Sequence, residues 1–179
     1  MRVLLIVVSE DNADEGGSPP LGSFASAYYA LQDASIEVVL ASQTGGYLFL
    51  DQSSTAAPDD VGALQRFQAD RSAREDLADT IRFEDVDAED FDGAICLGPP
   101  EGGADPQLPA PKLPGRVCLL VASLLDFGKP VVVIPECLAP ATGNGLMITG
   151  NRPDSPRHAA NALIGVLNAT IPRPDPSAC

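Results

Sequence analysis

The sequence predicts a single α/β domain with a doubly wound, mostly parallel sheet and helices on both faces. Four consecutive β-branched residues, Val131-Val132-Val133-Ile134, are typical of a strand that is buried on both sides. Strand-length apolar runs also alternate with segments of helical periodicity, which is the order that builds such a sheet. The length of 179 residues suits one domain, and we assign residues 1–170 to it and residues 171–179 to a flexible, proline-rich tail.

The elements of the first half follow from the spacing of apolar residues. Residues 3–8 are all aliphatic and predict the first strand, and residues 36–40 predict the second. Between them, a helix is expected at 21–33, because its apolar residues fall on one face at helical spacing: Leu21, Phe24, Tyr28 and Leu31. The Gly45-Gly46 pair predicts a turn before a short extended piece at 47–50. Further helices are expected at 61–67 and 73–81.

The second half repeats this alternation. A strand is expected at 93–97, followed by a proline-rich loop at 98–115 that is either a lid, a partner surface or a plain surface loop. The next helix, 116–127, should end at Gly128, since glycine adopts the left-handed conformation that terminates helices. The buried strand that begins at Lys129 follows. A last strand is expected at 146–149 and a closing helix at 155–167.

Composition excludes several classes of function. The formal charge of -14 leaves no basic surface for nucleic acid or anionic membranes. The apolar start is too short for a signal peptide, and no segment reaches transmembrane length. The sequence contains no phosphate-binding loop, dinucleotide fingerprint or metal-ligand pattern, so no cofactor and no metal is expected. Four cysteines without paired spacing predict reduced thiols in a cytoplasmic protein: Cys96, Cys118, Cys137 and Cys179.

Several segments, in the right order, match one known family. Residues 27–34 and 37–42 are similar to its first helix and second strand, and Gly45-Gly46 with Leu50-Asp51 to the hairpin that follows. Residues 77–80 and 86–92 are similar to its acidic approach to the third strand, and residues 144–151 to its closing strand motif, N-L-I-T-G-Q-N-P. The chain therefore resembles the PfpI intracellular-protease superfamily, the class I glutamine amidotransferase-like group that includes the parkinsonism-linked deglycase and the glyoxalase III chaperones. The resemblance implies a flavodoxin-like fold.

The departures from the family concern its catalytic groups. Family members carry a glutamate in the first helix that hydrogen-bonds the catalytic thiol, and the matching positions here are Gly22 and Ser23. The family's P-G-G-H-G turn, whose backbone helps to form the oxyanion site, corresponds to residues 98–103. Two prolines there remove backbone N–H donors.

The family's nucleophile motif, C-H-G-P-A, can be aligned in two ways. A gapless alignment places Pro135 at the nucleophile and removes the chemistry. An alignment with a two-residue insertion matches residues 137–141 to the motif, so that Cys137 takes the place of the nucleophile and Leu138 replaces its histidine. We favour the insertion, because Pro140-Ala141 then matches as well. Only six residues separate Cys137 from Asn144, so the segment that follows the nucleophile in active relatives is shortened here.

The candidate site residues follow the carboxyl ends of the predicted strands, where ligands bind in parallel sheets. As catalytic candidates we take Cys137, Glu136 and Glu101, and as candidates for substrate binding Ser9, Glu10, Ser23 and Gly98. A thiol at the start of a helix has a lowered pKa, whereas an ionised glutamate beside it raises the pKa. Cys137 is therefore either a reactive thiol or an inert remnant, and the two glutamates are either proton-transfer groups or exposed loop residues.

Two functions follow from these alternatives. The first is a divergent family member that binds or transforms a small molecule, with hydrolase, lyase or isomerase chemistry at a carbonyl and no organic cofactor, as the resemblance implies. The second is a non-catalytic binding or scaffold protein that kept the fold. Because the shortened segment should uncover apolar surface, we expect a homodimer or a larger homo-oligomer.

Overall fold

The computed structural model describes residues 1–9, 17–52, 60–99, 115–138, 145–152 and 155–170. Its centre is a six-stranded sheet with the strand order β3-β2-β1-β4-β5-β6, and every neighbouring pair is parallel. The strands are β1 (Arg2–Val7), β2 (Glu37–Ser42), β3 (Ile81–Arg82), β4 (Gly93–Leu97), β5 (Val131–Ile134) and β6 (Met147–Thr149). This is the predicted doubly wound, flavodoxin-like α/β fold.

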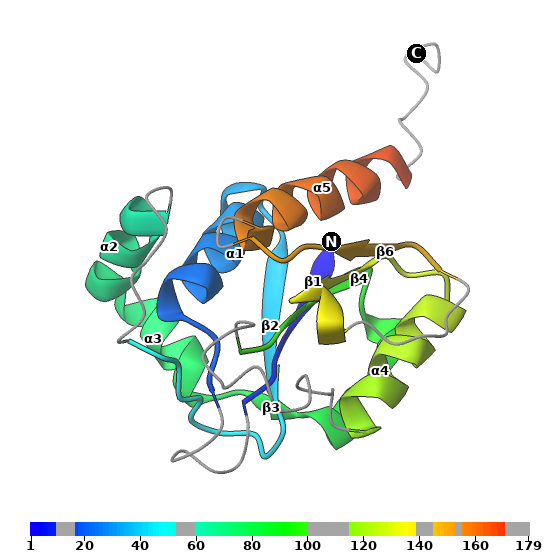
Figure 1. Ribbon diagram of the computed structural model, residues 1–179, viewed down its shortest axis with the longest axis horizontal. Coiled ribbons are helices and arrows are strands. Elements are labelled where there is room, and N and C mark those ends of the chain that lie inside the picture. The colour runs from blue at the N-terminus through cyan, green and yellow to red at the C-terminus, as the bar shows by residue number, and fades with distance from the viewer. Residues whose placement is uncertain (10–16, 53–59, 100–114, 139–144, 153–154, 171–179) are drawn as a thin grey trace, which may run out of the picture.

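Helices cover both faces of the sheet (Figure 1). The helices are α1 (Leu21–Asp33), α2 (Val61–Ala69), α3 (Arg71–Ala78), α4 (Gly115–Asp126) and α5 (Ser155–Thr170). Short 3-10 turns are η2 (Phe83–Asp85), η3 (Ala88–Asp90) and η4 (Glu136–Leu138). Helices α1 and α5 pack together on one face, whereas α4 covers the other.

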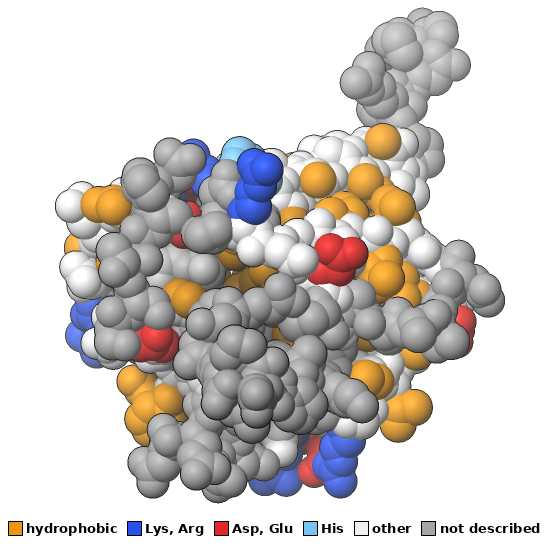
Figure 2. Space-filling model, in the orientation of Figure 1, with side chains coloured by type: hydrophobic (Ala, Val, Ile, Leu, Met, Phe, Trp, Pro, Cys, Tyr) orange, Lys and Arg blue, Asp and Glu red, His pale blue; other side chains and the backbone are white. Residues whose placement is uncertain are grey.

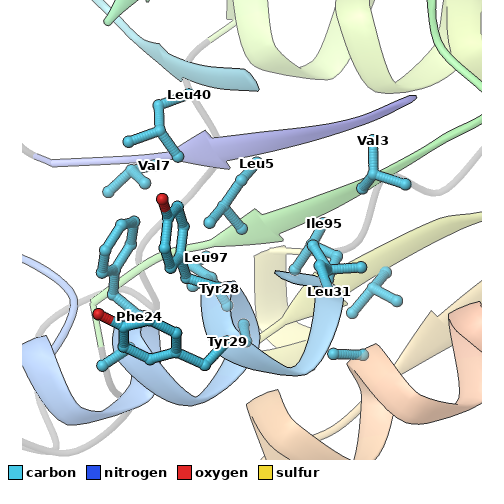
Figure 3. Packing of buried hydrophobic residues seen from close by; sticks show 14 of the residues in the cluster. Val3, Leu5, Val7, Phe24, Tyr28, Tyr29, Leu31, Leu40, Ile95 and Leu97 are labelled. Atoms are coloured by element: carbon cyan, nitrogen blue, oxygen red, sulfur yellow. The ribbon is translucent and has the colours of Figure 1, made fainter. Parts of the chain in front are cut away.

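Alternating side chains of the central strands build two cores. Val3, Leu5 and Val7 of β1 point toward α1, where they pack with Phe24 and Leu31, as Figure 3 shows. The intervening residues of β1, Leu4 and Ile6, pack in the second core beneath α4. Because successive side chains of a strand point to opposite faces of the sheet, a strand that is apolar at every position packs in both cores. Each fully buried aliphatic side chain contributes on the order of 1.5–3 kcal/mol to folding.

The run of β-branched residues is buried as predicted. Val132 and Ile134 of β5 belong to the core under α1 and α5, and Val131 and Val133 belong to the core under α4. Helix α1 and strand β4 have the predicted limits. Helix α4 ends at Asp126, and Gly128, two residues later, has the expected left-handed φ of 70°.

One predicted helix is wrong at its end. The sequence predicts a helix through Ile81, but α3 ends at Ala78 and Ile81 pairs with Ala41 as the edge strand β3. The Thr80 hydroxyl donates to the carbonyl of Gly46 at 2.8 Å and is hydrogen-bonded to the Ser42 hydroxyl at 2.7 Å. These contacts with the end of β2 and with the turn after it stabilise a non-helical conformation at Thr80. The short apolar pattern in the sequence does not indicate them.

Other predictions differ in smaller ways or fall outside the described residues. The piece expected to be extended at 47–50 forms no strand, although the N–H of Leu48 donates to the carbonyl of Leu77 at 2.9 Å. Most of the proline-rich loop at 98–115 and the whole tail at 171–179 lie outside the described residues.

Candidate functional site

The switch point of the sheet lies between β1 and β4, because the chain winds away from these two strands in opposite directions. Backbone hydrogen bonds join the carboxyl ends of neighbouring strands. The N–H of Val8, after β1, donates to the carbonyl of Leu97 at the end of β4, and the N–H of Gly98, after β4, donates to the carbonyl of Ile134 at the end of β5, both at 2.8 Å. Ser9, half-buried, and Gly98, buried, therefore follow adjacent strands at the edge where parallel sheets bind ligands.

The loops that leave this edge are in contact. A Cβ atom added to Gly17, which precedes α1, would lie 2.9 Å from the Cβ of Pro99, which follows β4. The first turn of α1 begins four residues after Gly17 and contains buried Gly22 and half-buried Ser23. The position where the family carries its helix glutamate is thus occupied by residues without an acidic group.

The turn after β5 contains Glu136, whose side chain is exposed. Its backbone N–H donates to Oδ1 of Asn151 at 2.6 Å, and Nδ2 of Asn151 donates to Oε2 of Glu136 at 3.3 Å. Asn151 follows β6, the neighbour of β5, so two adjacent strand ends are joined through one residue pair. The Glu136 carboxylate and the Asn151 amide thus lie within hydrogen-bond distance at the carboxyl edge of the sheet.

Sequence reasoning did not select Asn151 as a site residue. Its signal was present, because it is the last residue of the segment that matches the family's closing strand motif. The pairing with Glu136 spans 15 residues of sequence and depends on the adjacency of β5 and β6. That adjacency becomes visible only in the folded sheet.

Leu138 is a second residue at this edge whose packing the sequence did not predict. Its side chain is 3% exposed and packs in the core beneath α4. A Cβ atom on Gly98 would lie 2.0 Å from Cδ1 of Leu138, so the leucine occupies the space directly against the end of β4. Where the resemblance puts a histidine beside the thiol, this chain has a buried apolar contact.

The remaining candidates are described only in part. Cys137 belongs to the turn η4, between Glu136 and Leu138, but its side chain lies outside the described part of the structure. Glu10 and Glu101 also lie outside the described residues. Ser9, Gly98 and Glu136 thus follow the ends of three adjacent strands, β1, β4 and β5.

Two other thiols provide a contrast with Cys137. Cys96 is fully buried on β4, and burial, with a smaller effect from nearby Cys118, raises the pKa of its thiol to about 12. Such a thiol stays protonated at neutral pH and is a poor nucleophile. Cys118, on α4, is half-buried.

A cavity of about 390 Å³ lies elsewhere, between α1, α2 and α5. Among the predicted site residues that the structure describes, none lines it. Within the described ranges, no group of three or more His, Cys, Asp or Glu side chains is arranged to hold a metal ion. In the same part of the chain, no helix is both long enough and apolar enough to cross a membrane.

Comparison with known proteins gives matches by structure only. No family model matches the chain, and no curated protein matches it. The rapid encystment protein of 24 kDa from Francisella tularensis matches with a TM-score of 0.65 and 15% identity, over 93% of this chain and 98% of that one. A ThiJ/PfpI domain protein from Brachyspira murdochii has a TM-score of 0.58 and 16% identity, over 95% and 98%.

Glyoxalase III from Candida albicans matches with a TM-score of 0.59 and 14% identity, over 92% of this chain and 96% of that one. The matches therefore span nearly the whole of both chains. Sequence identities of 14–16% to solved structures show a shared fold and no more. The predicted resemblance is confirmed at that level: the chain has the α/β fold of the ThiJ/PfpI and glyoxalase III structures.

Proposed function

We propose that this protein is a divergent member of the PfpI superfamily that binds or transforms a small carbonyl compound at the carboxyl edge of its sheet. The observation that carries this proposal is the pairing of Glu136 with Asn151, which joins the turn that contains Cys137 to the residues after the adjacent strand β6. Fixed polar groups at this edge are the usual basis of ligand binding in parallel α/β sheets.

In this proposal Cys137 acts as the nucleophile or as an acid, and Glu136 or Glu101 is its proton-transfer partner. Ser9, Glu10, Ser23 and Gly98 would bind the substrate around them. The glutamate carboxylate accepts the proton of the thiol, and the thiolate then adds to the carbonyl carbon as the C=O π bond breaks. The carboxyl group returns the proton to the developing oxyanion, which gives a hemithioacetal. Neither step needs an organic cofactor.

The experiment is thiol labelling at neutral pH with a mild reagent, followed by mass spectrometry. We expect Cys137 to be labelled faster than Cys118, and Cys96 to stay unlabelled in the folded protein because it is buried and protonated. Asn151→Ala should change the rate at Cys137 and leave Cys118 unaffected, since it removes the partner of Glu136. Labelling of Cys137 no faster than of Cys118 would contradict the proposal.

A second candidate function is a non-catalytic binding or scaffold protein. Leu138 favours it, because a buried leucine packed against Gly98 stands next to Cys137 in the sequence, where the resemblance implies a polar catalytic partner. An unreactive Cys137 in the labelling experiment would support this alternative.

As part of the same proposal, the protein is cytoplasmic and forms a homo-oligomer. The fully buried thiol of Cys96 and the absence of paired cysteine spacing in the sequence support a reducing compartment. Exposed large apolar side chains support self-association: Tyr47, Phe49, Leu119, Phe127 and Leu146 are 49–73% exposed. Figure 2 shows hydrophobic side chains reaching the surface in several places.

A further inference from the structure

The cavity between α1, α2 and α5 is separate from the carboxyl edge and has its own polar lining. Figure 1 shows α1 between the other two helices. The volume of about 390 Å³ is within the range of small-molecule pockets. Small residues on two helices create the space, among them Ala30 of α1 with Gly62 and Ala63 of α2.

Hydrogen-bonded side chains form the floor of the cavity. Ser26, 3% exposed, donates a hydrogen bond from its hydroxyl to the carboxylate of Asp60, which is 1% exposed. Tyr29 also lines the cavity, and the Tyr29 hydroxyl donates to Asp70 at 3.0 Å. Because the Ser26 proton is directed to Asp60 and the Tyr29 proton to Asp70, the floor offers no free hydroxyl proton of its own.

The rim supplies N–H donors. The guanidinium of Arg66 lies over the ring of Tyr29, 4.0 Å from its centroid, and its Nη1 donates to Asp33 at 2.7 Å. This contact uses one of the five N–H groups of the guanidinium and holds its plane in place. Arg157 and Asn161, four residues apart on α5, complete the lining. They face the cavity together because side chains four residues apart share one side of a helix.

We propose that this cavity binds a small organic anion through a carboxylate or phosphate group held by Arg66 and Arg157. Two guanidinium groups and one amide surround the space, and planar guanidinium groups bind these oxyanions through paired hydrogen bonds. Among the described residues of the lining, Asp33 is the one with an acidic side chain. The ion pair that it forms with Arg66 is exposed, with side-chain accessibilities of 64% and 48%, so an incoming oxyanion can replace Asp33 at little cost.

The anion site does not depend on the proposed chemistry at Cys137. Its lining comes from three helices, whereas the residues of that chemistry follow the strand ends. A reactive Cys137 without anion binding in the cavity would contradict only the anion proposal. Anion binding with an unreactive Cys137 would contradict only the proposed chemistry.

The experiment is calorimetric titration of the full chain with inorganic phosphate and, separately, with succinate, each at matched ionic strength. We expect saturable binding of at least one of them, and the preferred one identifies the group recognised. Amide chemical shifts in the ¹⁵N spectrum should change at residues 26–33, 61–66 and 157–161. Arg66→Gln and Arg157→Gln should each weaken binding on the order of tenfold or more, because each removes a charged hydrogen-bond donor.

Three controls separate this from general charge effects. Arg116→Gln, on α4 at the opposite face of the sheet, and Cys137→Ser should leave binding unchanged. Gly62→Leu should abolish binding without unfolding the protein, because a Cβ there meets no heavy atom within 4 Å. The proposal is overturned if neither anion binds saturably at millimolar concentration, if choline binds equally well, or if Arg66→Gln binds as the unaltered protein does.

Discussion

At the scale of single residues, Gly98 and Leu138 fix the packing of the candidate site. We expect Gly98→Ala to lower the free energy of unfolding by about 1–3 kcal/mol, because the new methyl group would lie 2.0 Å from Cδ1 of Leu138. Urea unfolding measures this change. Gly165→Ala, in open space on α5, is the matched control and should stabilise the protein by up to about 1 kcal/mol.

A double variant tests the cause. Leu138→Ala alone should cost about 2–5 kcal/mol as a cavity-forming substitution. Combined with Gly98→Ala, the cost should be smaller than the sum of the two single costs, since removing the leucine side chain gives the methyl group room. Strict additivity would show that the two residues do not meet.

The family's standard activities are also decided by single residues. The resemblance assigns them to a cysteine, a histidine and a helix glutamate acting together. Here Gly22 and Ser23 stand at the glutamate position, and in the favoured alignment Leu138 stands at the histidine position. We expect negligible glyoxalase III, deglycase and peptidase activity in purified protein. Robust conversion of methylglyoxal that is lost in Cys137→Ala would contradict this prediction.

At the scale of elements, the junction between α1 and α3 should be sensitive to acid. The backbone N–H of Ala73 and then the hydroxyl of Tyr29 hold the pKa of Asp70 below its ordinary value of 3.8. This stabilisation is complete at pH values above the unfolded pKa, near 4, and is lost as the pH falls through the lower folded pKa. In Asp70→Asn, the decrease in the urea midpoint below pH 4 should be shallower than in the unaltered chain.

The matched control for the junction is Asp85→Asn, an exposed carboxylate in η2. It should keep the full decrease in the midpoint with acid. A parallel decrease in Asp70→Asn and the unaltered protein would show that Asp70 has no part in the acid sensitivity.

At the scale of the whole molecule, we expect a homodimer or a larger assembly. Tyr47 and Phe49 are 60% and 73% exposed and pack edge to face, with ring centroids 4.9 Å apart. Aromatic side chains exposed in this way are typical of protein interfaces. Light scattering at micromolar concentration should give at least twice the chain mass of 18.6 kDa.

The double variant Tyr47→Ser/Phe49→Ser should shift this mass toward the monomer, because it removes the exposed aromatic pair. Leu119→Ser, which removes an equally exposed apolar side chain on α4, is its comparison. A monomer for the unaltered chain would rule out self-association at these concentrations. Dissociation by Leu119→Ser alone would move the interface to α4.

The sequence by itself determined the α/β architecture, the strands other than β3 and the apolar face of α1. The buried strand β5 is indicated by its unbroken run of β-branched residues, because both of its faces pack in a core. The apolar face of α1 is indicated by a spacing of about 3.6 residues. The family resemblance was likewise read from motifs in order, and it was sufficient to predict the architecture that the solved structures share.

Only the tertiary structure decided what these elements bring together. The pairing of Glu136 with Asn151, the contact of Leu138 with Gly98 and the strand β3 each join residues that are distant in sequence. The cavity lined by Arg66 and Arg157 lies between α2 and α5, which are separated by about half of the chain. No local period records such contacts, because they arise from the adjacency of strands and helices after the chain has folded.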